Sequence, residues 1–183
     1  DVAVDGRLHR RRIEELAAFG LEYVEQPVRT IDELVAVRAA VSVPLAADEA
    51  VRLAADPMRV VDAGAVDILV LKPQPMGGVA RALDLARRSG LPVVVSSALE
   101  SSIGLAAGIA LAAALPELRY ACGLGTATLL EGDLTDHPLF PVGGEVEVRR
   151  PEPSPALLER WQGDRETESR VMRRLREAAE LLT

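Results

Sequence analysis

The sequence is poor in aromatic residues and has a single cysteine. Aromatic side chains make up 3% of its 183 residues and hydrophobic residues 49%, so Ala, Val and Leu must form the core. The lone Cys122 excludes an internal disulfide and fits the reducing conditions of the cytosol. We therefore expect a core of small aliphatic side chains in a cytoplasmic protein.

Positive charge and long apolar runs are also scarce. The net charge of −7 argues against a nucleic-acid partner, because phosphate binding needs a basic surface. The longest apolar stretch, Ile103 to Leu115, has 13 residues and is too short to cross a bilayer. No charged-then-apolar leader opens the sequence. We expect neither secretion nor a membrane partner, and we expect Ile103 to Leu115 to form a buried helix.

Lysine is almost absent, since Lys72 stands alone beside twenty arginines. It follows the apolar run that begins at Asp67. A lysine amine can be moved toward neutrality by burial, whereas a guanidinium stays protonated. Lys72 is therefore the first candidate for a catalytic group, and the competing interpretation is a solvated lysine at a strand end.

Short apolar runs recur at nearly constant spacing. Four of them end at residues 25, 48, 72 and 96, and a fifth spans residues 120–124. The segments between them have helical periodicity, and Thr30 with Glu33 predicts a capping box at the first. Continuous apolar strands that alternate with helices indicate a parallel sheet covered by helices. The short, regular unit favours an α/β fold of the (β/α)8 barrel type.

Polar groups follow four consecutive strands of this predicted sheet. In a barrel such strand ends converge on one mouth. Two carboxylates at one mouth suit Mg²⁺, and a neighbouring lysine can move a proton or stabilise charge. We expect Glu49 to support the site by a hydrogen bond to Lys72. The strand-end groups are Glu25, Asp48 with Glu49, Lys72, and Ser96 with Ser97.

The order of these motifs resembles the enolase superfamily, in its muconate-lactonizing subgroup and the o-succinylbenzoate synthase branch. The resemblance runs from about residue 13 to residue 150. It is carried by the blocks LEYVEQP, VPLAADEAVR, DILVLKPQPMGGV, VVVSSALESSIGLAAGIALAAALPEL and YACGLGTATLLEGD.

This resemblance implies a role for each strand-end group. Glu25 and Asp48 would be the second and third ligands of a divalent cation, Mg²⁺, and Lys72 would face the ring of a small carboxylate substrate. Ser96, Ser97 and Glu100 would line the substrate pocket. The implied reaction is a dehydration in menaquinone biosynthesis that begins with removal of a proton beside the metal-bound carboxylate, by way of an enediolate.

The sequence also departs from the family pattern. It holds no counterpart of the N-terminal capping domain, the first barrel strands or their Lys-x-Lys motif. Asp1 is the candidate for the first metal ligand. We expect residues 1–150 to form a partial barrel, from about strand three or four to strand eight, and residues 151–183 a linker and a helix that closes it. Open sheet edges predict either a missing N-terminal half as partner or a homo-oligomer.

Three other functions fit parts of the pattern. An N-acylamino acid racemase of the same superfamily would use similar residues, whereas a dipeptide epimerase is disfavoured because the last strand has no Asp-x-Asp. A Schiff-base aldolase would use Lys72 but would leave Glu25 and Asp48 unexplained. An inactive half-barrel is the third alternative, because the acid/base lysine pair is missing.

Overall fold

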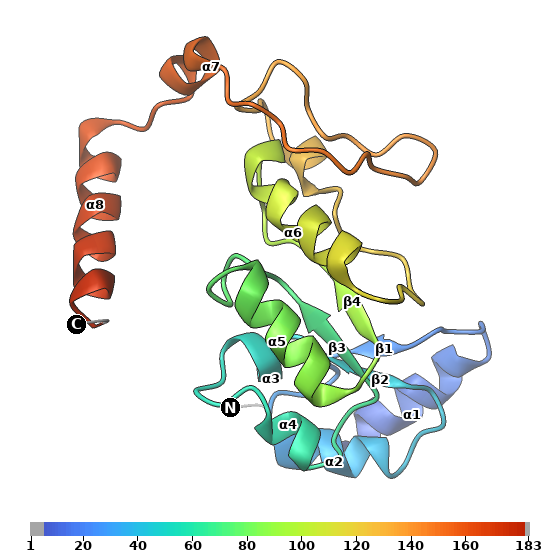
Figure 1. Ribbon diagram of the computed structural model, residues 1–183. Coiled ribbons are helices and arrows are strands. Elements are labelled where there is room, and N and C mark those ends of the chain that lie inside the picture. The colour runs from blue at the N-terminus through green and yellow to red at the C-terminus, as the bar shows by residue number, and fades with distance from the viewer. Residues whose placement is uncertain (1–5, 182–183) are drawn as a thin grey trace.

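The computed structural model describes residues 6–181 of the chain (Figure 1). Four short strands alternate with helices, and a two-helix arm follows them. The strands are β1 (Val24–Glu25), β2 (Leu45–Ala47), β3 (Ile68–Leu71) and β4 (Val93–Val95). The helices are α1 (Gly6–Ala17), α2 (Ile31–Arg38), α3 (Glu49–Arg52), α4 (Arg59–Asp62), α5 (Val79–Ser89), α6 (Ser102–Ala114), the 3-10 turn η1 (Thr126–Leu129), α7 (Pro155–Arg160) and α8 (Arg165–Glu180).

The strands form one parallel sheet in chain order, β1-β2-β3-β4. Neighbouring strands pair through their apolar runs: Glu25 lies beside Ala46, and Ala46 lies beside Ile68. The predicted fifth strand is reduced to one parallel bridge, between Ser96 and Gly123. This unbroken order of parallel strands is the sheet expected for part of a (β/α)8 barrel.

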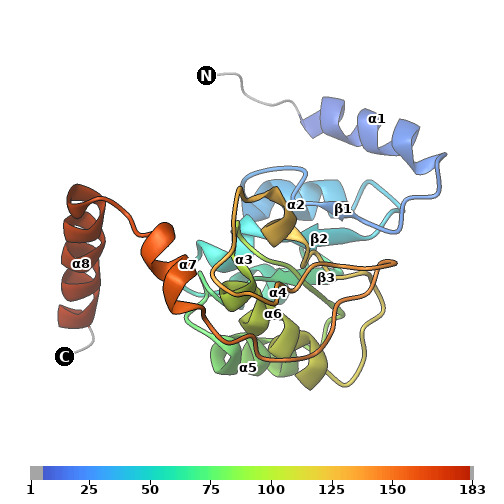
Figure 2. The same cartoon turned by 90° about the horizontal axis from the view of Figure 1, so that it is seen from above.

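The two faces of the sheet have different surroundings. The side chains of Leu45, Leu69 and Val95 belong to the large core that includes α2, α5 and α6. Figure 2 shows these helices in an arc along one side of the strands. The opposite face carries a separate small cluster, formed by Ala46, Ile68, Val70 and Val94 with Tyr23 and Tyr120 against it. Helices on a single face distinguish a barrel wall from a sheet that is covered on both sides.

Local signals in the sequence set two of the helix ends. Thr30 accepts a hydrogen bond from the backbone N–H of Glu33, whose carboxylate accepts one from the N–H of Thr30, so the predicted capping box is confirmed. Gly90 ends α5 in the left-handed conformation, with φ of 64°. The apolar stretch from Ile103 forms α6, with Leu105, Ile109 and Leu111 buried in the main core.

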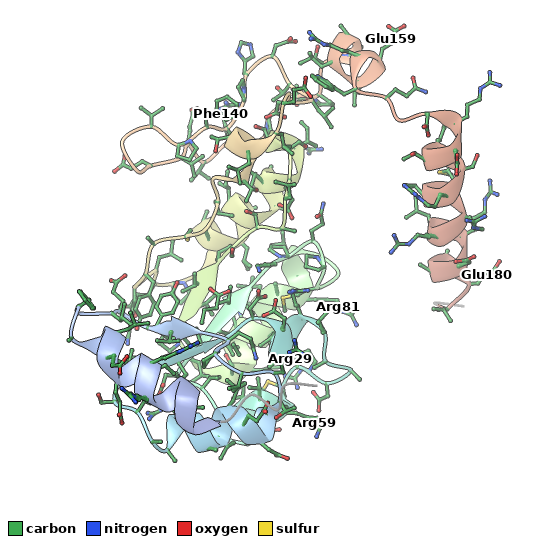
Figure 3. The ribbon with its side chains drawn as sticks, turned by 180° about the vertical axis from the view of Figure 1, so that it is seen from behind. Arg29, Arg59, Arg81, Phe140, Glu159 and Glu180 are labelled. Atoms are coloured by element: carbon green, nitrogen blue, oxygen red, sulfur yellow. The ribbon has the colours of Figure 1, made fainter. Side chains whose placement is uncertain are left out.

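The last part of the chain forms an arm. Trp161 at the end of α7 packs so closely on Gly132 that a Cβ there would lie 2.2 Å from the indole ring. Beyond it, α8 stands clear of the sheet in both views (Figures 1 and 2), and Figure 3 shows Glu180 far from Arg29, Arg59 and Arg81 on the body. The predicted helix is therefore present, but its role in closing the barrel stays a prediction. Before the arm, Val142 and Glu145 form an isolated antiparallel bridge.

None of the helices among the described residues is long and apolar enough to span a membrane.

Candidate active site

The pleat of the sheet places the predicted site residues on one face. Side chains alternate between faces along a strand, and parallel partners point the same way. Asp48 follows Ala46 by two residues, Lys72 follows Val70, and Ser96 follows Val94. Glu25 is paired with Ala46 in the register of β1 and β2. All four groups therefore extend from the face with the small cluster, which is the interior side of the barrel wall.

Lys72 and Asp48 form an ion pair across β2 and β3. The lysine Nζ lies 2.5 Å from Asp48 Oδ2, and the two side chains are 16% and 4% exposed. Arg52 binds the other carboxylate oxygen, with Nε 3.0 Å from Asp48 Oδ1. A buried carboxylate with a cationic side chain on each of its two oxygens is held in a fixed orientation.

The expected contact between Glu49 and Lys72 is wrong for this structure. Glu49 instead pairs with Arg52, whose Nη2 lies 2.5 Å from Glu49 Oε1, while Lys72 pairs with Asp48. The reason is local geometry. The side chain of Asp48 extends from the same face of the sheet as that of Ala46, whereas Glu49 is already the first residue of α3. Glu49 supports the site through Arg52, a residue that the sequence interpretation left without a role.

Gln26 is a second residue whose role the sequence interpretation missed. Its side-chain oxygen accepts hydrogen bonds from the backbone N–H groups of Asp48 (3.0 Å) and Ala50 (3.1 Å), and its nitrogen donates to the carbonyl of Val28. Its φ of 39° makes it the one non-glycine residue with positive φ in the described part of the chain. Gln26 thus ties the end of β1 to the turn that carries Asp48.

Glu25 lies within electrostatic range of Asp48 and Lys72. Loss of hydration and then the negative charge of Asp48 raise the pKa of Glu25, while the charge of Lys72 acts in the opposite direction. Two carboxylates that repel each other at one strand edge provide the hard oxygen donors that Mg²⁺ prefers. Glu25 and Asp48 therefore fit the two described ligands of a divalent cation.

These two residues do not complete a metal site by themselves. Within residues 6–181 no group of three or more His, Cys, Asp or Glu side chains gathers closely enough to hold a metal. Asp1, the candidate first ligand, lies outside the described residues. Further oxygen ligands must come from groups beyond Glu25 and Asp48, such as water and substrate.

The segment that follows β4 lies next to the end of β3, which carries Lys72. Ser97 is buried and donates through its hydroxyl to the carbonyl of Gly123 at 2.8 Å, within 3.0 Å of the hydroxyl of Thr126. Thr126 also accepts from the backbone N–H of Glu100 at 3.3 Å. Ser96 lies against Gly123, where a Cβ would be 2.7 Å from the serine Oγ. The hydroxyl of Ser97 therefore serves the structure of the wall, while Ser96 lies on the interior face.

Glu100 is the most unusual polar group of this wall. It is 5% exposed, and its Oε1 has no hydrogen-bond partner among the described residues. Burial raises the pKa of its carboxyl group. A buried carboxyl with a spare oxygen has the capacity to take a hydrogen bond from, or give one to, a bound molecule.

Comparison with known proteins places this arrangement in a family. The family described as "Enolase C-terminal domain-like" matches residues 3–153. Two relatives named o-succinylbenzoate synthase are 64% identical over 140 residues (Thermobifida fusca; 76% of this chain, 44% of the relative) and 56% identical over 138 residues (Mycolicibacterium smegmatis; 75% and 43%).

A solved structure has the same architecture. The 2-chloromuconate cycloisomerase of Rhodococcus opacus 1CP superimposes with a TM-score of 0.77 at 27% identity, over 87% of this chain and 46% of that one. The chain thus spans less than half the length of these proteins. Since the family match covers residues 3–153 and the parallel wall has the same architecture, the chain belongs to the enolase C-terminal domain-like family.

Proposed function

We propose that this chain forms the C-terminal part of the barrel of an Mg²⁺-dependent o-succinylbenzoate synthase. The observation that carries the proposal is the 64% identity over 140 residues to a relative of that name. The geometry supports it, because Glu25, Asp48 and Lys72 extend from the same face of the wall. The reaction is loss of water from a succinyl-hydroxycyclohexadiene carboxylate in menaquinone biosynthesis, in the cytoplasm.

Glu25 and Asp48 hold the cation in this proposal. Bound Mg²⁺ supplies a concentrated positive charge that stabilises the substrate carboxylate as the neighbouring C–H bond breaks. Arg52 keeps Asp48 oriented through its Oδ1, and Gln26 fixes the backbone of Asp48. These contacts set the position of the carboxylate before the substrate arrives.

In this proposal Lys72 would present its ammonium to the substrate ring once the cation replaces it at Asp48, the carboxylate with which it pairs in this structure. Its side chain is largely buried, so its charge acts at close range on the negative charge that develops when the proton leaves. The proton and the hydroxyl group leave the substrate as water. Ser96 and Glu100 would bound the pocket on the side of β4, and Ser97, which the resemblance also places there, supports this segment through its hydrogen bond to Gly123.

The group that moves the proton comes from outside these 183 residues. The resemblance to the family implies that this group is a lysine, and since Lys72 is the only lysine in the chain, that lysine would lie on another segment of the complete barrel. We propose that this segment pairs with the open edge of β1, where the backbone groups of an edge strand can accept a further strand.

A graft tests the proposal directly. The matching 140 residues of the Thermobifida fusca relative are replaced by those of this chain, and o-succinylbenzoate is followed by ultraviolet absorbance with and without Mg²⁺. We expect Mg²⁺-dependent product formation that falls by about a hundredfold to a thousandfold in the Lys72→Ala graft, as for loss of a charge-stabilising group. The exposed Asp62→Ala graft is the matched control and should retain full activity.

A graft that folds and binds Mg²⁺ but forms no o-succinylbenzoate would overturn the assignment. Activity of the same graft on N-acylamino acids would instead assign it to racemisation.

A further inference from the structure

The start of α6 is capped by a residue from far along the chain. Ser101, at the capping position, makes no side-chain cap bond within the described residues. Asp133 supplies it instead: its two carboxylate oxygens lie 3.1 and 3.2 Å from the backbone nitrogen of Ser102. The hydroxyl of Ser102, which is fully buried, donates to the same carboxylate at 2.5 Å. An acidic group here also complements the positive end of the helix.

Asp133 is itself held in place from two directions. Its Oδ1 accepts from the backbone N–H of Leu134 at 2.6 Å, and the carbonyl of Leu134 accepts from Ser154 at 2.8 Å. The neighbouring Gly132 lies directly under the indole ring of Trp161. Ser102 completes the network, because its hydroxyl accepts from the backbone N–H of Leu139 at 2.7 Å.

The same segment also contacts the residues that directly follow β4, which would line the substrate pocket in the proposed function. Thr126 binds the hydroxyl of Ser97 and the backbone N–H of Glu100. Residues 126–139, which we name the 126–139 clamp, therefore hold residues 97–102 at both ends. Glu100 is itself attached to the clamp through its backbone N–H, which donates to Thr126, so Asp133 acts on Glu100 both through Ser102 and by anchoring the clamp that carries Thr126. The carboxyl of Glu100 is the buried group with an unpartnered oxygen.

We propose that Asp133 is a positioning residue for the substrate pocket: by holding Ser102 it fixes the backbone of Glu100 at the pocket wall. The inference rests on the proposed function in one respect, the claim that Glu100 borders the bound substrate. Asp133 lies outside the strand-end set and touches neither the carboxylates nor Lys72 in any contact described above. Its effect on Glu100 is carried by Ser102, two residues farther along the chain, and by Thr126 of the clamp.

Amide hydrogen exchange of this chain tests the positioning without any activity. In Asp133→Ala, we expect the amides of both Ser102 and Glu100 to exchange about tenfold faster, as for loss of one net hydrogen bond. The β3 amides of Leu69 and Val70 should keep their rates. Asp133→Asn should restore most of the protection, because its amide group can still accept from Ser102. The exposed Asp136→Ala, in the same segment, is the matched control.

Three results would overturn the proposal. Faster exchange at Ser102 with unchanged exchange at Glu100 would show that Asp133 only caps the helix. Equal acceleration at Leu69 and Val70 would show a general loss of stability. Failure of Asp133→Asn to restore protection would remove the role of the acceptor oxygen. None of these depends on the identity of the reaction.

The graft gives the functional consequence. Asp133→Ala in the active graft should raise the KM for substrate by about tenfold and change kcat by less than about threefold, the pattern of lost binding at a pocket wall. An unchanged KM would contradict the proposal. In Asp133→Ala of this chain, the emission of Trp161, its only tryptophan, reports whether Gly132 of the clamp has moved away from the indole ring.

Discussion

Tyr23 and Tyr120 meet edge to face over the interior side of the sheet, with ring centroids 5.3 Å apart and ring planes at 78°. Tyr23 precedes β1, at one edge of the sheet, and Tyr120 precedes the bridge residue Gly123 at the other. Both rings pack on the cluster of Ala46, Ile68, Val70 and Val94. In a chain with few aromatic residues, two of them thus cover the apolar face that a complete barrel encloses.

This contact predicts energetic coupling between the two edges of the sheet. Tyr23→Leu and Tyr120→Leu should each lower the free energy of unfolding, and the double variant should lose about 0.5–1.5 kcal/mol less than the sum, the usual worth of an aromatic pair. Urea denaturation measures all four proteins. Tyr23→Leu combined with Phe140→Leu, an exposed residue on a distant loop, is the control and should be additive (Figure 3). Additivity of the tyrosine pair would contradict the coupling.

The Lys72–Asp48 pair predicts that removal of Lys72 alone lowers the free energy of unfolding more than removal of both partners. Lys72→Met leaves the buried Asp48 carboxylate with Arg52 alone and should lower the free energy of unfolding by about 3 kcal/mol. The double variant Lys72→Met/Asp48→Leu should recover part of that loss, since no charge then stays buried without its partner.

Urea denaturation checks this order. Arg29→Met, an exposed arginine of the body, serves as the control and should change stability by less than about 0.5 kcal/mol (Figure 3). A double variant less stable than Lys72→Met would show that the ion pair is not the origin of the loss.

The order of the strands and the face from which their end groups extend were within reach of the sequence, for a physical reason. Runs such as Ile68–Leu71 are buried on both faces, so they predict parallel strands, and the regular spacing predicts where each one ends. The fifth apolar run, residues 120–124, has a described neighbour on one side only, and it pairs with that neighbour through a single bridge, between Gly123 and Ser96. The pleat further determines which of two adjacent carboxylates, Asp48 or Glu49, faces the interior.

Contacts between distant segments were beyond sequence reasoning. Gln26 binds the turn after β2 across 22 residues, and Asp133 caps α6 across 31. The presence of a Gln or an Asp in a sequence does not predict a distant partner, because such polar side chains most often contact nearby backbone groups or solvent. Their roles follow from tertiary structure alone.

The buried carboxyl of Glu100 predicts a distinct pH dependence. Its pKa in the folded state is raised above the usual 4.5, so the folded state holds the proton more tightly than the unfolded state does. This contribution is fully present below pH 4.5 and is lost as pH rises through the raised pKa. Glu100→Gln should therefore gain stability relative to the original chain as pH increases above 4.5.

Urea denaturation between pH 4 and pH 8 measures this difference. The exposed Glu152→Gln is the matched control, and its difference from the original chain should stay flat across the range. A flat difference for Glu100→Gln would mean that its carboxyl is hydrated in solution, and a difference that falls with pH would mean that a cation stabilises its ionised form.

Gln26 gives a prediction in which the usual order of alanine and glycine is reversed. Gln26→Ala removes the acceptor of two backbone N–H groups, those of Asp48 and Ala50, and should lower the free energy of unfolding by about 2–3 kcal/mol. Gln26→Gly removes the same acceptor but relieves the positive φ of 39°, so it should be the more stable of the two. At an ordinary position glycine is the less stable residue, because it loses more backbone entropy on folding.

The matched pair is Gln162→Ala and Gln162→Gly, at an exposed position outside the positive-φ region, where the alanine variant should be the more stable. Urea denaturation of all four variants decides the matter. A Gln26→Ala chain as stable as the original would mean that water replaces the amide oxygen at both N–H groups. A Gln26→Gly chain less stable than Gln26→Ala would mean that the left-handed backbone is not retained in solution, and the position of Asp48 would then depend on Arg52 and Lys72 alone.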